Sequence, residues 1–141
     1  MTNHTCTVFI EINATQSTVW DALINPEKVK QYLFGTNLSC DWKVGSPIKF
    51  TGEWEGKAYE DKGVVLQFQP EQILKYSYWS GFTGQADLPE NYQTITFRLT
   101  EEKGKSLLTL TQENCKTEEA RARSEQNWNM VLTQVKALLE K

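Results

Sequence analysis

Residues 117–141 read TEEARARSEQNWNMVLTQVKALLEK, and this stretch decides the architecture. Its large apolar side chains fall at helical spacing and form one stripe, made of Trp128, Val131, Leu132, Val135, Leu138 and Leu139. Thr117 is a candidate N-cap, and the two glutamates after it suit the positive end of the helix dipole. The pattern predicts one amphipathic helix of about 24 residues, roughly 36 Å long.

The chain before this helix consists mostly of strand-like segments. Residues 5–13 alternate polar and apolar side chains, as a half-buried strand does. Residues 15–24 change to helical spacing, and Asn25 followed by Pro26 marks the start of a second short helix. From Cys40 the period returns to two, and the strand-like runs are residues 48–54, 59–69, 72–79, 92–100 and 108–113.

This order of segments predicts an α+β protein. We expect a curved antiparallel sheet of about six to seven strands wrapped around the long C-terminal helix, with two short helices after the first strand. Gly63, inside the longest strand-like run, is expected to mark a bulge or a bend. Because 141 residues is the usual size of one domain, we expect a single domain over residues 1–141.

The charge and hydropathy of the chain exclude several classes of protein. The net charge is −3, whereas nucleic-acid binding depends on basic patches, so we expect no nucleic-acid partner. The sequence has neither the pattern of a signal peptide nor an apolar run of about 18 residues. We therefore expect no membrane partner and a cytoplasmic location.

Candidate metal ligands and nucleophiles are few and far apart. His4 is the single histidine and lies at the start of the chain, where it is a poor general base. Cys6, Cys40 and Cys115 are widely spaced, which suits a reducing compartment and small buried side chains. With no Cys-x-x-Cys and no histidine pair, the sequence predicts no metal site, and it implies no cofactor. No residue is assigned as catalytic.

Acidic side chains are the remaining candidates for acid–base chemistry. Glu53, Glu55, Glu60 and Asp61 cluster on neighbouring strand-like runs. Strand alternation places Glu53 and Glu55 opposite Trp54, which favours solvent exposure for both. One of the four could point inward, and such a carboxylate would need desolvation or a partner to be useful in catalysis.

Several short phrases occur in an order that resembles a known superfamily. They are VWDAL at 19–23, NPE at 25–27, IKF at 48–50, GVV at 63–65, DLPENYQTITF at 87–97, LTLTQ at 108–112 and the terminal helix. Together they resemble the helix-grip, or START-like (SRPBCC), superfamily, and within it the family named for the activator of heat-shock protein 90 ATPase. The resemblance covers nearly the whole chain. It implies a helix-grip fold whose sheet and long helix enclose an apolar cavity, open near the N-terminal half of the helix.

The candidate ligand-binding residues are aromatic. By the resemblance, the cavity lining would be Phe50, Trp54, Tyr76, Tyr78, Phe97 and Trp128. Large rings either fill a core or line a pocket, and their spacing does not distinguish the two. The resemblance favours the cavity. It implies that the protein binds a small hydrophobic or amphipathic ligand, such as a lipid, between the sheet and the C-terminal helix.

Two other functions stay open at this point. The first is a chaperone-interacting, ATPase-activator-like module in the stress response. In the family this domain is usually joined to a separate N-terminal chaperone-binding domain, which we do not expect here. The second is an enzyme with a carboxylate or tyrosine in the cavity. We expect binding rather than catalysis, because the family has no catalytic signature of its own. The sequence predicts neither the identity of the ligand nor the oligomeric state.

Overall fold

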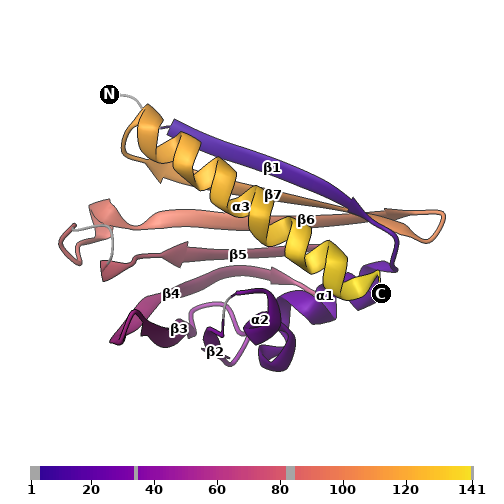
Figure 1. The fold of residues 1–141 in the computed structure, drawn as a ribbon, viewed down its shortest axis with the longest axis horizontal. Coiled ribbons are helices and arrows are strands. Elements are labelled where there is room, and N and C mark those ends of the chain that lie inside the picture. Colours follow the sequence, from indigo (N-terminus) through magenta and orange to yellow (C-terminus); the bar gives the residue numbers. More distant parts are fainter. Residues whose placement is uncertain (1–3, 34, 82–84, 141) are drawn as a thin grey trace.

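The described residues form a seven-stranded antiparallel sheet and three α-helices (Figure 1). The computed structural model describes residues 4–33, 35–81 and 85–140. The elements are β1 (His4–Ile12), α1 (Gln16–Ile24), α2 (Pro26–Tyr32), β2 (Asn37–Cys40), β3 (Pro47–Trp54), β4 (Lys57–Gln69), β5 (Ile73–Tyr78), η2 (Pro89–Asn91), β6 (Gln93–Glu102), β7 (Lys105–Cys115) and α3 (Glu118–Leu139). The strand order is β1-β7-β6-β5-β4-β3-β2. The predicted helix-grip architecture is confirmed.

The long helix α3 crosses the sheet diagonally and packs mainly against β1 (Figure 1). Val131, Leu132 and Val135 from the predicted stripe are buried. The other stripe residues, Trp128, Leu138 and Leu139, are partly buried and pack against the same core. The apolar stripe therefore faces the sheet, as the spacing predicts.

The helices begin where side chains satisfy their first free N–H groups. The Thr117 hydroxyl accepts a hydrogen bond from the Ala120 N–H at 3.0 Å, which confirms Thr117 as the N-cap of α3. Asn25 caps α2 in the same way, with Pro26 as the first helical residue. These caps set where each helix starts, and so how α1 and α2 lie against one end of the sheet.

Two details of the sheet differ from the sequence prediction. The short strand β2 is not predicted, because Leu38 is its only buried residue and four residues give no clear period. Gly63 does not mark the register shift between β4 and β5, which falls between Val65 and Gln67. A Cβ at Gly63 would lie 1.6 Å from the Ser77 carbonyl oxygen, so glycine is needed there for close approach of the two backbones.

The length and polarity of the helices also bear on membrane insertion. Within the described ranges, no helix combines the length and the apolar character that crossing a bilayer requires. The longest helix, α3, carries charged residues along its exposed side, including three i,i+4 ion pairs.

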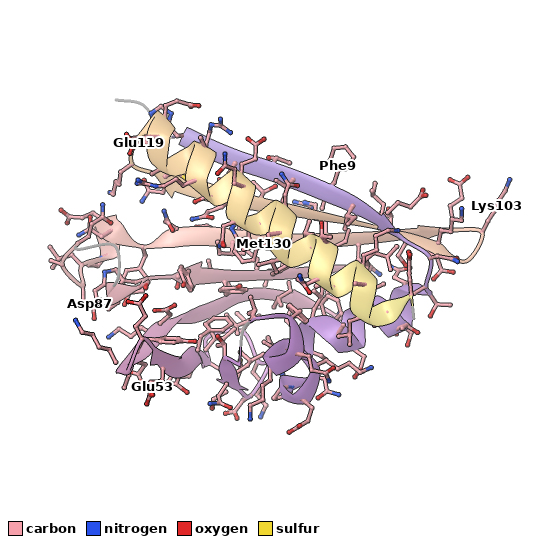
Figure 2. All side chains as sticks on the ribbon, in the orientation of Figure 1. Phe9, Glu53, Asp87, Lys103, Glu119 and Met130 are labelled. Atoms are coloured by element: carbon pink, nitrogen blue, oxygen red, sulfur yellow. The ribbon has the colours of Figure 1, made fainter. Side chains whose placement is uncertain are left out.

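The packing of α3 on the sheet gives a first prediction. Leu132→Ala should lower the free energy of unfolding by about 2–5 kcal/mol, because the side chain is 1% exposed and its removal leaves a cavity. Met130→Ala is the matched control on the same helix, since Met130 is 45% exposed (Figure 2) and should change stability by only about 0.5 kcal/mol. Urea unfolding of both variants measures this. Equal losses would contradict the assigned inner face of α3.

Candidate functional site

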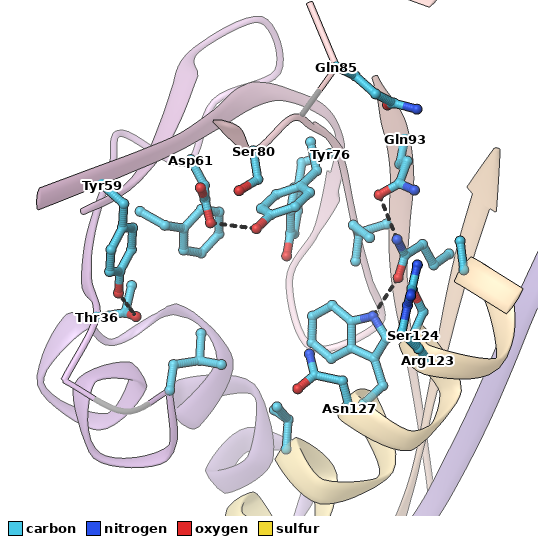
Figure 3. A pocket seen from close by; sticks show the side chains of 18 of the residues that line it. Thr36, Tyr59, Asp61, Tyr76, Ser80, Gln85, Gln93, Arg123, Ser124 and Asn127 are labelled. Carbon is cyan, nitrogen blue, oxygen red and sulfur yellow. Dashed lines mark hydrogen bonds between the residues drawn. The ribbon is translucent and has the colours of Figure 1, made fainter. Parts of the chain in front are cut away.

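A cavity of about 890 Å³ lies between the sheet and the N-terminal half of α3 (Figure 3). Strands β3, β4 and β5 supply one wall, and β6, β7 and α3 supply the other. Before Trp128, the α3 side chains that line it are small or polar, including Ala120, Ser124 and Asn127, and Trp128 and Val131 border it from the middle of the helix. The helix therefore does not fill the space beneath its first half, whereas the buried stripe fills the space beneath its second half.

Aromatic rings form the inner wall of the cavity. Phe50 on β3 lies 5.8 Å from Tyr76 and 6.0 Å from Tyr78, measured between ring centroids. Phe97 packs behind this wall, edge-on against Trp128 at 6.1 Å, and borders a residual void of about 20 Å³ in the packed core. The aromatic rings therefore have two roles: some fill the packed core, and others border the large cavity.

The six aromatic residues predicted as cavity lining have different positions. Phe50, Tyr76, Tyr78 and Trp128 all border the large cavity. Phe97 is 8% exposed and belongs to the packed core beside it. Trp54 is the last residue of β3, and its side chain lies outside the described part of the structure. Whether these residues bind a ligand stays a prediction.

Three side chains in the wall formed by β6, β7 and α3 are linked by hydrogen bonds. The indole Nε1 of Trp128 donates to Gln112 Oε1 at 2.6 Å, and Gln112 Nε2 donates to Gln93 Oε1 at 2.6 Å (Figure 3). Gln112 is 6% exposed, so its polar atoms depend on these partners. Gln112 is not among the residues predicted from the sequence to line the cavity. The available signal was its place in β7, where it continues the inward-facing positions of Leu108 and Leu110.

Asp61 is the carboxylate that faces the cavity. The Tyr78 hydroxyl donates to Asp61 Oδ2 at 2.5 Å (Figure 3). The other oxygen, Oδ1, is buried and has no hydrogen-bond partner among the described residues. Glu53, Glu55 and Glu60 are exposed, so of the four clustered acids it is Asp61 whose carboxylate is drawn into the wall.

Burial raises the pKa of the tyrosines of the cavity. Desolvation raises the pKa of Tyr76 far above its ordinary value. The pKa of Tyr78 is also raised well above its ordinary value, first by desolvation and then by the charge and hydrogen bond of Asp61. Burial likewise raises the pKa of the Cys6 and Cys115 thiols, which disfavours their reactive thiolate forms.

Charged residues stand at the rim of the cavity. Glu53, Lys116 and Arg123 are exposed and border it. Lys116 Nζ donates to the Glu90 carbonyl at 2.8 Å, and Arg123 pairs with Glu119 at 3.0 Å. The cavity thus offers aromatic faces and amide groups along its walls, one carboxylate inside, and mixed charges at its opening.

The described residues do not assemble a metal site. Within the described ranges, no group of three His, Cys, Asp or Glu side chains is placed to hold a metal ion. His4 Nδ1 lies 3.7 Å from Glu118 and is not among the residues that line the cavity. The chemically distinctive group in the cavity is therefore the pair of Asp61 and Tyr78.

A family model described as "Activator of Hsp90 ATPase homolog 1-like protein" matches residues 13–140. The chain belongs to this family. The predicted resemblance is thereby confirmed at the level of the family. No curated protein matches the chain.

Solved structures from several bacteria share the fold. The solution structure of ChR145 from Cytophaga hutchinsonii is 50% identical, covers 97% of this chain and 94% of its own, and has a TM-score of 0.85. CalU16 from Micromonospora echinospora is 18% identical, with coverage of 98% and 77% and a TM-score of 0.78. The Aha1 dimer from Colwellia psychrerythraea is 22% identical, with coverage of 99% and 97% and a TM-score of 0.75. The last two similarities concern the fold alone.

The position of Trp128 between core and cavity gives a second prediction. Trp128→Ala should cost less than the roughly 3–5 kcal/mol of a fully packed ring, because one side of the indole borders the cavity. Phe97→Ala is the control, since that ring is packed in the core and should show the full loss. Urea unfolding measures both, and a Trp128 loss as large as that of Phe97 would argue for a filled cavity.

The buried tyrosines give a third prediction, on alkaline stability. The pKa of Tyr76 is raised in the folded state, so above about pH 10 the unfolded chain loses a proton that the folded protein keeps. Stability should therefore fall as pH rises past that value. Between about pH 8 and about pH 11, Tyr76→Phe should reduce this fall by about 1 kcal/mol. Urea unfolding at both pH values measures it, and an unchanged fall would mean that Tyr76 ionises freely in the folded protein.

Proposed function

We propose that the protein is a cytoplasmic binding protein that holds a small hydrophobic or amphipathic molecule in the cavity between the sheet and α3. The observation that carries this proposal is the cavity itself, about 890 Å³ in volume. Pockets for small ligands typically measure about 300–1,000 Å³ and combine apolar walls with a few polar groups. Membership of a helix-grip family supports the same interpretation.

The composition of the walls favours an amphipathic ligand over a purely apolar one. Phe50, Tyr76 and Tyr78 provide ring surface, while Gln93 and Gln112 provide amide groups on the other side. The free-energy cost of an amide at a cavity wall is small when a ligand or solvent forms hydrogen bonds with it. The cost is larger when an apolar part of a ligand covers the amide. A molecule with an apolar body and at least one polar group therefore fits both walls.

A cavity-blocking variant tests this function and is the fourth prediction. Asn127 and Asn129 are both exposed, but Asn127 lines the cavity and points into it (Figure 3), whereas Asn129 does not line it. Decan-1-ol, a neutral amphiphile, should raise the melting temperature of the wild type and of Asn129→Trp but not of Asn127→Trp. A ligand specific to the folded state stabilises it by about 2.7 kcal/mol at a hundred times its Kd.

The pair of asparagine variants makes the thermal-shift result specific. Both replace the same residue type on the same helix by the same large ring, so a general effect of tryptophan on α3 would appear in both. A shift that survives in Asn127→Trp would place binding outside the cavity. No shift in any of the three proteins would remove the proposed function.

A second candidate function is interaction with a chaperone, in the manner of an ATPase activator. Family membership supports it, because the matching model is described by activation of the Hsp90 ATPase. The test is the ATPase rate of a heat-shock protein 90 at saturating amounts of this protein. A reproducible rise would support the second candidate, and an unchanged rate would remove it. The third hypothesis, an enzyme that uses a carboxylate or tyrosine, stays a prediction that rests on Asp61 and Tyr78.

A further inference from the structure

Asp61 lines the cavity, and one of its two carboxylate oxygens has no hydrogen-bond donor in the part of the chain that the structure describes. Tyr78 satisfies Oδ2 at 2.5 Å, whereas Oδ1 is buried without a partner among the described residues. A buried carboxylate oxygen is costly unless a donor or a cation faces it, and a native structure rarely leaves one unpaired. In the register of β3 and β4, Asp61 pairs with Phe50, which is apolar. An apolar side chain would therefore suit the position of Asp61.

The basic residues nearest to Asp61 in the sheet are engaged elsewhere. Lys62, the next residue along β4, pairs with Asp87 at 2.5 Å. Lys49, beside Phe50 on β3, lies 3.9 Å from Glu60. Both lysines occupy strand positions that alternate with the inward face, so their ammonium groups point away from the Asp61 carboxylate. The chain itself therefore supplies no cation to this oxygen within the described residues.

The rings around Asp61 favour the same kind of group. Phe50 and Tyr78 meet edge to face at 6.0 Å, and Tyr76 lies 5.8 Å from Phe50. The faces of aromatic rings carry negative electrostatic potential and attract cations, and recognition of ammonium groups commonly uses such rings. A carboxylate and aromatic faces on one wall both attract a cation, and the carboxylate repels an anionic group.

We propose that the ligand of this cavity carries a protonated amine on an apolar body, and that the ammonium group binds Asp61 Oδ1. This inference rests on the proposed function and names its ligand class. Tyr78 holds the carboxylate through Oδ2. Oδ1 has almost no accessible surface in this structure, so the Asp61 side chain has to turn toward the cavity for Oδ1 to contact the ammonium group. The opposite side of the cavity carries Arg123 and Asn127, so the ammonium end lies at the sheet and the other end faces α3 (Figure 3).

Three probes with the same ten-carbon chain test the inference. Decylamine, decan-1-ol and decanoate, each kept below its micellar concentration at neutral pH, differ only in the charge of the head group. The wild type should bind decylamine at least about tenfold more tightly than decan-1-ol, since a charge-assisted hydrogen bond contributes enough for that ratio. Decanoate should bind most weakly. Isothermal titration calorimetry gives the three Kd values.

A pair of carboxylate variants assigns the preference to Asp61. Asp61→Asn keeps the shape but removes the charge, and should bring the amine and the alcohol to within about threefold of each other. Glu60→Gln is the matched control, because Glu60 is the adjacent, exposed acid on β4 and should keep the full preference. This control matters because a chain of net charge −3 attracts any cation weakly.

Each outcome decides one claim. Equal affinity of the wild type for all three probes, or tighter binding of decanoate, would overturn the amine inference and leave the proposed function standing. An Asp61→Asn variant that keeps the preference would also overturn it. Absence of binding for all three probes would overturn the proposed function, and the inference with it. The comparison of the three probes on the wild type needs no variant, so it tests the amine inference even if Asp61→Asn does not fold.

Discussion

The structure depends on one mismatch along α3: only from Trp128 onward does the helix carry large apolar side chains toward the sheet. Val131, Leu132 and Val135 are buried against β1 and its neighbours. Hydrophobic burial there anchors a 22-residue helix as one rigid piece. The first half of the same piece is held over the sheet by that anchor, although Ala120 and Ser124 cannot fill the space beneath it. Core and cavity therefore have a single cause.

The cavity walls show how polar groups are maintained next to a core. The indole of Trp128 is held by Gln112, and Gln112 by Gln93, so this side of the cavity is a connected network. On the other side Tyr78 holds one oxygen of Asp61. Burial raises the pKa of Tyr76 and Tyr78, so both hydroxyls keep their protons into the alkaline range and Tyr78 stays a hydrogen-bond donor there.

Much of the architecture could be predicted from the sequence, because long periodic segments and caps are local signals. The stripe of α3, the Thr117 cap and most of the strands belong to this class. The four-residue strand β2 could not be predicted, since it has no period to detect. Gln112 and Asp61 could be placed inward only by counting strand alternation. Their partners lie on other segments of the sheet and on α3, and sequence spacing does not reveal those contacts.

The existence of the cavity required the three-dimensional arrangement. The same aromatic spacing suits a filled core, and Phe97 is in fact packed in the core while Phe50 borders the cavity.

The most direct measurement is a native mass spectrum of wild-type protein incubated with the three ten-carbon probes. The account predicts a non-covalent adduct that disappears on denaturation and is absent from Asn127→Trp. A bare mass in every case, or an adduct equally abundant in that variant, would contradict it.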